Sequence, residues 1–367
     1  MYDAGVSSPL AAALATLAPL VPRIEAERRL PREAVDALVA AGVFKLLVPH
    51  AYGGAGAEPR VAVETIEAIA QVDGSAGWCA MIALTSSLMC DLLDDATARE
   101  VYGPADAITC GVFAPMGRAI PEGDGYRVSG RWSFASGCEH SQWRMAGTLA
   151  PGSQEVLSVL LRADQTRIED TWHASGLRGT GSHDFVVEDA LVPRTHAFSL
   201  VARAGSRRLT IASPRPFFGI LSACIAGVGL GLGRAAIDAF SAIARDKKLP
   251  GGKKTIATRE LVPVDVARAE ARLGAARAYL YEQLAGDGSL HARARLRLAA
   301  VNAVEAGAEV TTAMFRAGGG GAVYARSPLQ RYQRDAQVVA QHIMVSSLAT
   351  TTAGRVLLDI ESDTSTL

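Results

Sequence analysis

The chain has 367 residues, which is more than one ordinary domain usually contains, so several packed parts with a large core are expected. Its 37 lysine and arginine residues balance 37 aspartate and glutamate residues, and this neutrality gives no electrostatic footprint for nucleic acid or an anionic membrane surface. The 5 cysteines are odd in number and lack C-x-x-C spacing, which argues against a disulfide framework or a structural zinc site. A reducing cytoplasm is the predicted compartment.

Residues 1–105 are predicted to form an α-helical domain. The apolar run Pro9–Pro22 is interpreted as a first helix rather than a secretion signal, because Asp3 stands where such a signal has basic residues. Pro31 opens a second helix that Gly42 closes, and Asp73 caps a later one.

Residues 106–208 are predicted to form a β-domain, because short alternating runs are separated by glycine, proline and aspartate. A hairpin signal at residues 122–125 precedes a strand that carries Trp132 and Phe134 on one face. Ser136 and Gly137 follow, with a hydroxyl and an unshielded backbone that could face a flat aromatic ligand. The alternative is that Trp132, Phe134 and Trp143 only fill a β-core.

Residues 209–367 are predicted to form a four-helix bundle, with short glycine-rich breaks between the helices. The expected helices are Phe217–Arg245, Glu260–Leu284, His291–Phe315 and Leu329–Leu358. Phe217–Gly233 carries no charge and approaches the length of a membrane span, but its five glycines favour a buried helix of a bundle. The fold class is therefore α+β, with helices, then a β-domain, then a bundle.

Common hydrolytic and nucleotide-binding signatures are absent from the sequence. It has neither H-E-x-x-H nor G-x-S-x-G, and the glycines from Gly227 to Gly233 do not have the G-x-G-x-x-G spacing. Metal-dependent hydrolysis, serine hydrolysis and a Rossmann nucleotide site are therefore not expected, and no metal site is predicted.

Four motifs resemble one enzyme superfamily. They are V-P-x-x-Y-G-G at residues 48–54, A-P-x-G at 114–117, G-R-W-x-F-x-S-G at 130–137, and the run Gly176–Asp184. Together they resemble the acyl-CoA dehydrogenase superfamily, and most closely its reduced-flavin-dependent oxygenases of the 4-hydroxyphenylacetate hydroxylase type. The expected fold has an N-terminal helical domain, a central β-barrel or sandwich that binds flavin, and the C-terminal bundle.

The resemblance implies the oxygenase component of a two-component flavin-dependent monooxygenase. Such a component takes reduced flavin, FMNH₂ or FADH₂, from a separate NAD(P)H:flavin reductase. It hydroxylates an aromatic or polycyclic small molecule with oxygen through a C4a-(hydro)peroxyflavin. Two alternatives stay open: a flavin dehydrogenase or oxidase of the same fold, and a non-catalytic member of the fold.

His342 is the expected catalytic residue. In the dehydrogenases that this region resembles, an R-D-A run leads after about two helical turns to the glutamate base, but here Arg334-Asp335-Ala336 leads to His342. No carboxylate occurs between Asp335 and Asp359, or from Arg207 to Ile237, which weighs against dehydrogenation of an acyl-CoA. A near-neutral imidazole can take a phenolic or amine proton. The alternative is a core histidine bonded to a backbone carbonyl.

Ser136 is the second catalytic candidate, because the resemblance implies that its hydroxyl accepts a hydrogen bond from N5–H of the reduced flavin. The alternative is a strand-end serine that bonds its own backbone. The residues expected to bind the cofactor are Phe113, Ala114, Trp132, Phe134, Ala135, Ser136, Gly137, Arg245, Gly319 and Gly320.

Two departures from the family pattern leave the cofactor and substrate open. Gly111-Val112-Phe113 stands where several phenol hydroxylases have a serine, which puts a phenol held by that serine in doubt. The R-x-x-F-G contact to the adenine half of FAD is missing, since Arg245–Lys248 is followed by Pro250–Gly252. A basic loop could hold the phosphate of FMN instead, or could be only a solvated loop. Likewise Gly318–Gly321 could contact a phosphate or could only end a helix.

The substrate pocket is expected to be apolar and to favour an aromatic or polycyclic molecule. Its predicted lining is Trp78, Met81, Thr85, Phe217 and Phe218. The alanine- and glycine-rich stretches Phe217–Gly233 and Val301–Val310 suggest close helix contacts between subunits. A homotetramer is expected, and a dimer is the second choice.

Overall fold

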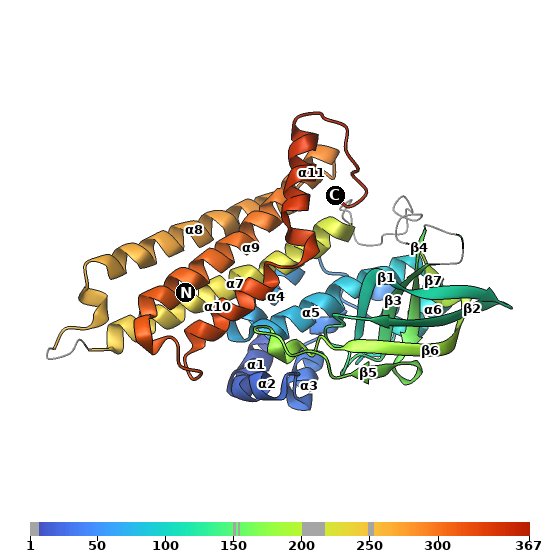
Figure 1. Ribbon diagram of the computed structural model, residues 1–367, viewed down its shortest axis with the longest axis horizontal. Coiled ribbons are helices and arrows are strands. Elements are labelled where there is room, and N and C mark those ends of the chain that lie inside the picture. The colour runs from blue at the N-terminus through green and yellow to red at the C-terminus, as the bar shows by residue number, and fades with distance from the viewer. Residues whose placement is uncertain (1–6, 150–151, 153–154, 200–216, 249–252) are drawn as a thin grey trace. The chain divides into compact units, whose positions relative to one another are not determined.

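The computed structural model describes residues 7–149, 152, 155–199, 217–248 and 253–367 (Figure 1). The described residues fall into two compact units, and each unit is described by itself. Of the described residues, the first unit takes in those from 7 to 62, from 79 to 174 and from 178 to 199. The second takes in Val63–Trp78, Ser175–Leu177 and the described residues from Phe217 to Leu367. The predicted domain boundary at residues 208 and 209 and the predicted turn at residues 250–252 lie outside the described residues.

Helices fill the chain up to residue 102, as the sequence predicts. They are α1 Ser8–Leu17, α2 Val21–Glu27, α3 Arg32–Ala40, α4 Pro59–Val72, α5 Gly74–Ser87 and α6 Asp95–Tyr102. The Asp73 side chain accepts a hydrogen bond from the Ala76 backbone N–H at 2.9 Å, which confirms the expected cap of α5. The predicted first helix is confirmed as α1, whose Leu10, Ala13 and Leu17 are buried.

A single seven-stranded mixed sheet forms the β-region of the first unit (Figure 1). Its strands are β1 Thr109–Glu122, β2 Gly125–Trp132, β3 Trp143–Leu149, β4 Val156–Arg162, β5 Arg167–Glu169, β6 Asp184–Pro193 and β7 Ala197–Phe198. They lie in the order β5-β6-β2-β1-β3-β4-β7, and only β1 and β3 pair in parallel. The strands confirm the expected β-structure in this part of the chain, and they form one mixed sheet where the sequence predicts a barrel or sandwich.

Trp132 lies inside the core of this sheet. A β-carbon added to Gly117 or Gly130 would lie 2.1 Å or 2.7 Å from its indole atoms, so the ring occupies the space that these glycines leave. Its Nε1–H donates to the Gly147 carbonyl at 2.7 Å, and the ring stacks on Phe185 at a centroid distance of 5.1 Å. The indole is wholly buried. Trp132 therefore supports the sheet from inside, and its expected direct contact with a flavin is wrong for this structure.

The second unit contains the C-terminal helices, with α7 Phe217–Asp246, α8 Leu261–Leu284, α9 Leu290–Gly318, α10 Pro328–Val339 and α11 Ser347–Leu357. Figure 1 shows α7 to α10 side by side, with successive helices running in opposite directions. The first three expected helices are confirmed within a few residues. The fourth is broken, because α10 ends at Val339 and a 3₁₀ turn, Ile343–Val345, separates it from α11.

Helices α7 and α9 touch through glycines. A β-carbon added to Gly307 would lie 2.3 Å from the Gly229 carbonyl oxygen, so the two backbones are in direct contact there. Most residues of the stretches Phe217–Gly233 and Val301–Val310 are therefore buried inside the bundle of a single subunit. The expectation that they form contacts between subunits is wrong for most of their length.

Two helical stretches, Gly74–Leu92 and Phe217–Asp246, are long and apolar enough to cross a membrane by length and composition. In both, 94% of the most apolar window is buried within the protein. The expectation that Phe217–Gly233 belongs to a buried bundle helix is confirmed.

The 5 cysteines are all free thiols and all buried. Burial raises the pKa of Cys90, Cys110 and Cys138, and raises that of Cys224 to about 12. The expectation of no disulfide framework is confirmed, because the described structure includes every cysteine of the chain.

Candidate active site

Two loops of the first unit are joined around Ser136. The Ala135 N–H donates to the His183 carbonyl at 3.0 Å, and the Gly137 N–H donates to the Thr180 carbonyl at 2.9 Å. The Ser136 and Ser182 hydroxyl oxygens lie 2.6 Å apart, and Ser182 lies 2.6 Å from the Thr180 hydroxyl oxygen. The sequence motifs at residues 130–137 and 176–184 therefore form one local structure. A hydroxyl that donates to Ser182 keeps lone pairs free to accept another hydrogen bond at Ser136.

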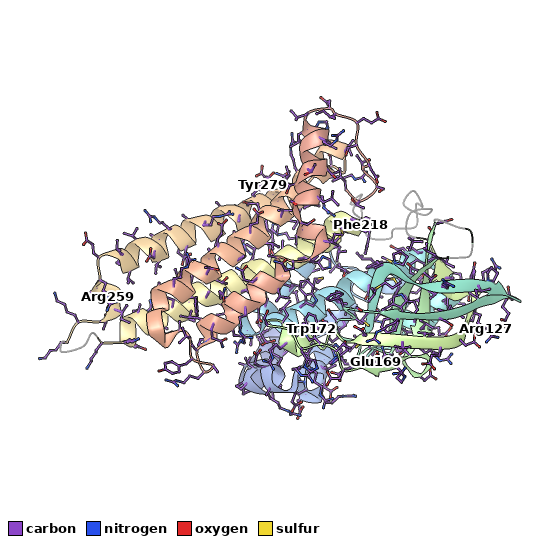
Figure 2. The ribbon with its side chains drawn as sticks, viewed as in Figure 1. Arg127, Glu169, Trp172, Phe218, Arg259 and Tyr279 are labelled. Carbon is purple, nitrogen blue, oxygen red and sulfur yellow. The ribbon has the colours of Figure 1, made fainter. Side chains whose placement is uncertain are left out.

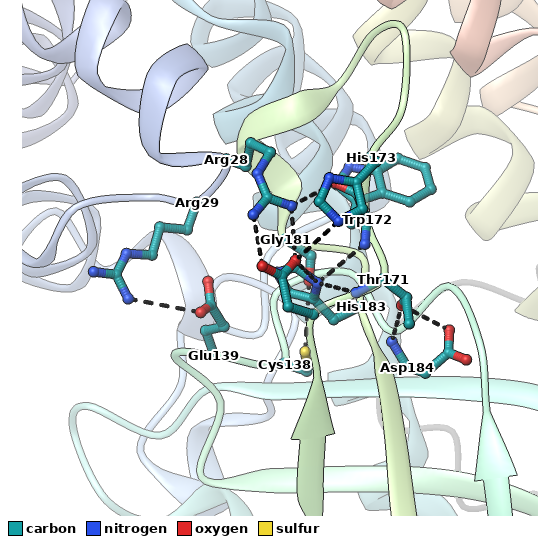
Figure 3. Close-up of polar contacts among 11 residues, drawn as sticks. Arg28, Arg29, Cys138, Glu139, Thr171, Trp172, His173, Gly181, His183 and Asp184 are labelled. Atoms are coloured by element: carbon teal, nitrogen blue, oxygen red, sulfur yellow. Dashed lines mark hydrogen bonds and ion pairs between the residues drawn. The ribbon is translucent and has the colours of Figure 1, made fainter.

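An ion pair fixes the second of these loops (Figure 3). Arg28, which ends α2 at a φ of 58°, donates two hydrogen bonds of 2.7 Å to the Asp170 carboxylate and one of 3.0 Å to the Trp172 carbonyl. The hydrogen bonds from Arg28 lower the pKa of Asp170 to about 2. Inside the loop, the buried His183 accepts from the backbone N–H groups of Thr171 and Trp172 through Nδ1. Such bidentate contacts hold the loop in one conformation.

Phe134 is an aromatic side chain held at the surface. Its φ is 65°, a rare conformation for a bulky residue, and 71% of the residue is exposed. Its ring meets Trp172 edge-on, with centroids 6.2 Å apart. Residues with a strained backbone conformation of this kind are often found at functional sites. Phe134 is therefore placed where a planar ligand could reach it, whereas the neighbouring Ala135 is fully buried and can offer only its backbone.

A bulge in β1 presents Phe113 and Ala114. The pairing with β3 runs from Val112↔Ala146 to Pro115↔Gly147, so the register shifts across Phe113 and Ala114 and the strand bulges there. Their carbonyl oxygens lie where a side chain on Gly147 would be, at 2.3 Å and 2.6 Å from an added β-carbon. Bulges re-aim backbone groups beside active sites. This arrangement agrees with the expected role of both residues in cofactor binding.

His342 lies in the second unit, just beyond the end of α10. Its Nδ1 accepts from the Met344 backbone N–H at 3.2 Å, which caps the following 3₁₀ turn, and its ring meets Trp78 edge-on at 5.6 Å. Burial, and secondarily the charge of Arg297, lower the pKa of His342 to about 4. The imidazole is thus neutral at pH 7, and since Nδ1 accepts, its proton is on Nε2. The lowered pKa departs from the expected near-neutral imidazole, and because Nδ1 is engaged by Met344 the geometry favours hydrogen-bond donation from Nε2.

The R-D-A run that precedes His342 has a structural role. Asp335 accepts a 2.6 Å hydrogen bond from the Leu177 N–H, and Arg334 donates to the Ser175 carbonyl. A β-carbon on Gly176 would lie 2.4 Å from the Arg334 carbonyl oxygen, so only glycine fits between them. The run therefore clamps residues 175–177. Because α10 ends at Val339, the expectation that Asp335 and His342 share one helix face is wrong.

The residues expected to line the substrate pocket are in different environments. Met81 and Thr85 are buried, and the Thr85 hydroxyl donates to the Met81 carbonyl of its own helix at 2.8 Å. Their expected role in lining the pocket stays a prediction. Trp78 contacts His342. Phe217 and Phe218 are half-buried at the start of α7, with ring centroids 5.1 Å apart, and Figure 2 labels Phe218 there.

Arg245 and the glycines Gly319 and Gly320 were expected to hold a flavin phosphate. Arg245 is exposed in the last turn of α7. Gly319 has a φ of 60°, and added β-carbons on Gly319 and Gly320 would meet nothing within 4 Å, so their backbone is open to a ligand. Lys247 Nζ would lie 3.2 Å from a β-carbon on Gly321. Gly321 therefore has a cationic neighbour, although it is Lys247 rather than Arg245.

The sequence does not predict a role for three of the residues at these sites. Ser182 and Thr180 lie inside a motif that the sequence predicts. The hydroxyl contact of Ser182 with Ser136 joins segments more than forty residues apart, and Thr180 reaches Ser136 only through Ser182. Arg297 lies among alternating arginines of α9, a pattern that usually marks a solvated face, yet it is buried. No local signal in the sequence separates it from its neighbours.

The residues of the first unit fit a flavin. An exposed aromatic ring at Phe134, a bulged backbone at Phe113 and Ala114, and a hydroxyl at Ser136 are the groups that a planar, hydrogen-bonding cofactor requires. In the part of the chain that the structure describes, no group of three or more histidine, cysteine, aspartate or glutamate side chains could hold a metal ion.

Comparisons with known proteins agree with this arrangement. Residues 11–101 match the N-terminal domain, and residues 223–347 the C-terminal domain, of acyl-CoA dehydrogenases. The chain is 37% identical to an indole-3-acetate monooxygenase of Pseudomonas putida over 89% of this chain and 87% of that protein. It is 28% identical to the oxygenase component of an FADH₂-dependent resorcinol hydroxylase of a Rhizobium species, covering 92% and 90%.

A solved structure extends the likeness to the whole fold. The crystal structure of 3-HSA hydroxylase from a Rhodococcus species superposes with a TM-score of 0.90 at 27% identity, covering 98% of each chain. The fold expected from the sequence motifs is confirmed, and so is the use of reduced flavin. The chain belongs to the acyl-CoA dehydrogenase superfamily, within its group of flavin-dependent monooxygenases.

Proposed function

We propose that the chain is the oxygenase component of a two-component monooxygenase that hydroxylates an aromatic small molecule, with reduced flavin supplied by a separate NAD(P)H:flavin reductase. The observation that carries this proposal is an imidazole, His342, at the place where dehydrogenases of the superfamily have a carboxylate base. Without that base, removal of a substrate α-proton has no acceptor. Bound reduced flavin supplies the electrons that activate oxygen.

The roles of the protein residues follow from their hydrogen bonds. The Ser136 hydroxyl, which lies 2.6 Å from the Ser182 hydroxyl oxygen, would hold a bound reduced flavin by accepting a hydrogen bond from its N5–H. His342 donates from Nε2 to an oxygen of the substrate or of the activated oxygen, since its Nδ1 is engaged by Met344. Trp78 and Phe218 supply aromatic surface for the substrate ring.

Names of two relatives narrow the substrate class within this proposal. Indole-3-acetate and resorcinol are both electron-rich aromatic compounds, and one of them carries a carboxylate. We expect a mono- or bicyclic aromatic substrate of this type. The cytoplasm is the proposed compartment, because the thiols are reduced.

The flavin-binding preference tests the proposal. The purified protein is expected to be largely colourless and to bind FMNH₂ or FADH₂ more tightly than the oxidised forms, because an oxygenase component must collect reduced flavin from solution. Anaerobic titration followed by absorbance measures both affinities, for FMN and FAD separately. A stoichiometric yellow flavin that survives dialysis would identify a flavin-retaining dehydrogenase or oxidase instead.

A homotetramer is the proposed assembly, with a dimer as the second choice. The second unit exposes several large apolar side chains, namely Leu261, Val264, Val323, Tyr324, Leu348, Leu358 and Ile360. Exposed apolar groups of this size mark protein contacts when they gather in patches. Light scattering at micromolar concentration is expected to give four times the subunit mass, and a monomer there would contradict the proposal.

A further inference from the structure

Arg297 is a buried cation to which the described residues supply no carboxylate side chain as a counter-ion. Its residue in α9 is 2% exposed, and its Nη1 donates to the carbonyl oxygens of Phe218 at 3.3 Å and Thr366 at 3.0 Å. Its Nε is buried without a hydrogen-bond partner, and no aspartate or glutamate of the described residues forms an ion pair with it. Outside the described ranges, Asp3 is the only acidic residue.

Such a charge is costly for the folded protein. Buried arginines are normally paired with a carboxylate, because two carbonyl dipoles replace only part of the lost hydration. Burial lowers the pKa of Arg297 to about 10, so the group still carries its charge at pH 7. A guanidinium offers two parallel N–H groups to a carboxylate, and Nε with a terminal nitrogen forms one such edge.

Contacts within the second unit lead from Arg297 to His342. The Phe218 carbonyl that accepts from Arg297 also accepts from the Ser222 hydroxyl at 2.7 Å, and that hydroxyl lies 3.4 Å from the Met344 carbonyl oxygen. Met344 in turn donates to His342. The charge of Arg297 also acts on the His342 ring. Aromatic side chains border this network, since Phe218 belongs to it and Trp78 contacts His342.

We propose that Arg297 binds the carboxylate of an aromatic acid substrate, whose ring packs against Trp78 and Phe218 next to His342. This deepens the proposed function and rests on it. A small acid fits better than a macromolecule, because so little of Arg297 is exposed. An aromatic acid fits better than an aliphatic one, because indole and phenyl rings adjoin the network. The substrate carboxylate supplies Arg297 with the negative charge and the hydrogen-bond acceptors that the described protein groups do not provide.

The test compares acids with their amides by calorimetric binding, which needs no turnover. The probes are phenylacetate, indole-3-acetate and 1-naphthaleneacetate, each paired with its amide. Wild-type protein is expected to bind at least one acid ~10- to 100-fold more tightly than the amide, the usual effect of a charged hydrogen bond. Arg297→Gln should lose that preference while amide binding changes little, and Arg297→Lys should keep part of it.

Arg293→Gln is the matched control. Arg293 lies one turn earlier on α9 and donates to the Leu367 carbonyl at 2.8 Å, so this variant also loses a contact with the C-terminal segment. It is expected to keep the acid preference. Equal loss in both variants, or no acid preference in the wild type, overturns the proposal. So does inorganic phosphate that binds as tightly as the acids and depends on Arg297, since that identifies a general anion site. Titration of reduced flavin in the same samples reports separately on the proposed function.

Discussion

His342→Ala is expected to lower product formation by on the order of 10² or more, the usual effect of a positioned acid–base or hydrogen-bonding group. Flavin affinity should stay nearly unchanged, because the contacts of His342 with Met344 and Trp78 involve none of the groups that fit the flavin. Hydrogen peroxide released per flavin oxidised should rise, since oxygen activation then proceeds without transfer to substrate. Product by chromatography and peroxide by a coupled assay give both quantities. The pKa of about 4 predicts that ionisation of His342 leaves the rate flat between pH 6 and pH 9.

His342→Asn separates chemistry from structure. Asparagine can cap the 3₁₀ turn at Ile343–Val345 by accepting from the Met344 N–H, as the imidazole does, but it lacks the Nε2–H. Both variants should therefore lose coupling, while only the alanine variant loses the cap. Normal coupling in both, with a lower melting temperature in the alanine variant, would show that His342 is a structural residue.

Gly307→Ala is expected to destabilise the bundle by ~2–3 kcal/mol or more, because the new methyl group would lie 2.3 Å from the Gly229 carbonyl oxygen. That oxygen belongs to the backbone of α7, so the overlap can be relieved only if α7 and α9 move apart. The small gain in helix propensity from glycine to alanine does not offset this. Thermal unfolding should begin several degrees lower.

Gly274→Ala makes the same chemical change in α8, where an added β-carbon would meet nothing within 4 Å. It should leave the melting temperature unchanged or raise it slightly, through helix propensity and a less flexible unfolded chain. If both alanine variants melt alike, the close contact between α7 and α9 is not a determinant of stability.

The sequence predicted the elements of this protein better than their contacts. Caps and glycine breaks located most helix ends, because these signals are local. The sequence did not predict the break between α10 and α11, because Ala340, Gln341 and His342 are all compatible with a helix. It depends on tertiary contacts such as that of His342 with Trp78.

The candidate site shows the same division. Motif spacing predicted Ser136 and His342 as site residues. It did not predict whether the Trp132 side chain faces a ligand or the core. That decision depends on the strand register, which places Gly117, Gly130 and Gly147 around the indole. Arg297 could not be predicted either, because its burial depends on the start of α7 and the C-terminal segment, both far away in sequence.

The burial of every cysteine has a consequence for the working life of the enzyme. Uncoupled oxidation of reduced flavin produces hydrogen peroxide, which attacks thiolates much faster than thiols. Cys90, Cys110, Cys138 and Cys224 combine burial with a raised pKa, so at pH 7 almost none of each is ionised. Met116 is 45% exposed, so its thioether sulfur is more accessible to peroxide than the sulfur atoms of these buried cysteines. Among the described residues, Met116 is therefore expected to be oxidised to its sulfoxide before any of these four cysteines reacts, a lesion that methionine sulfoxide reductases can repair.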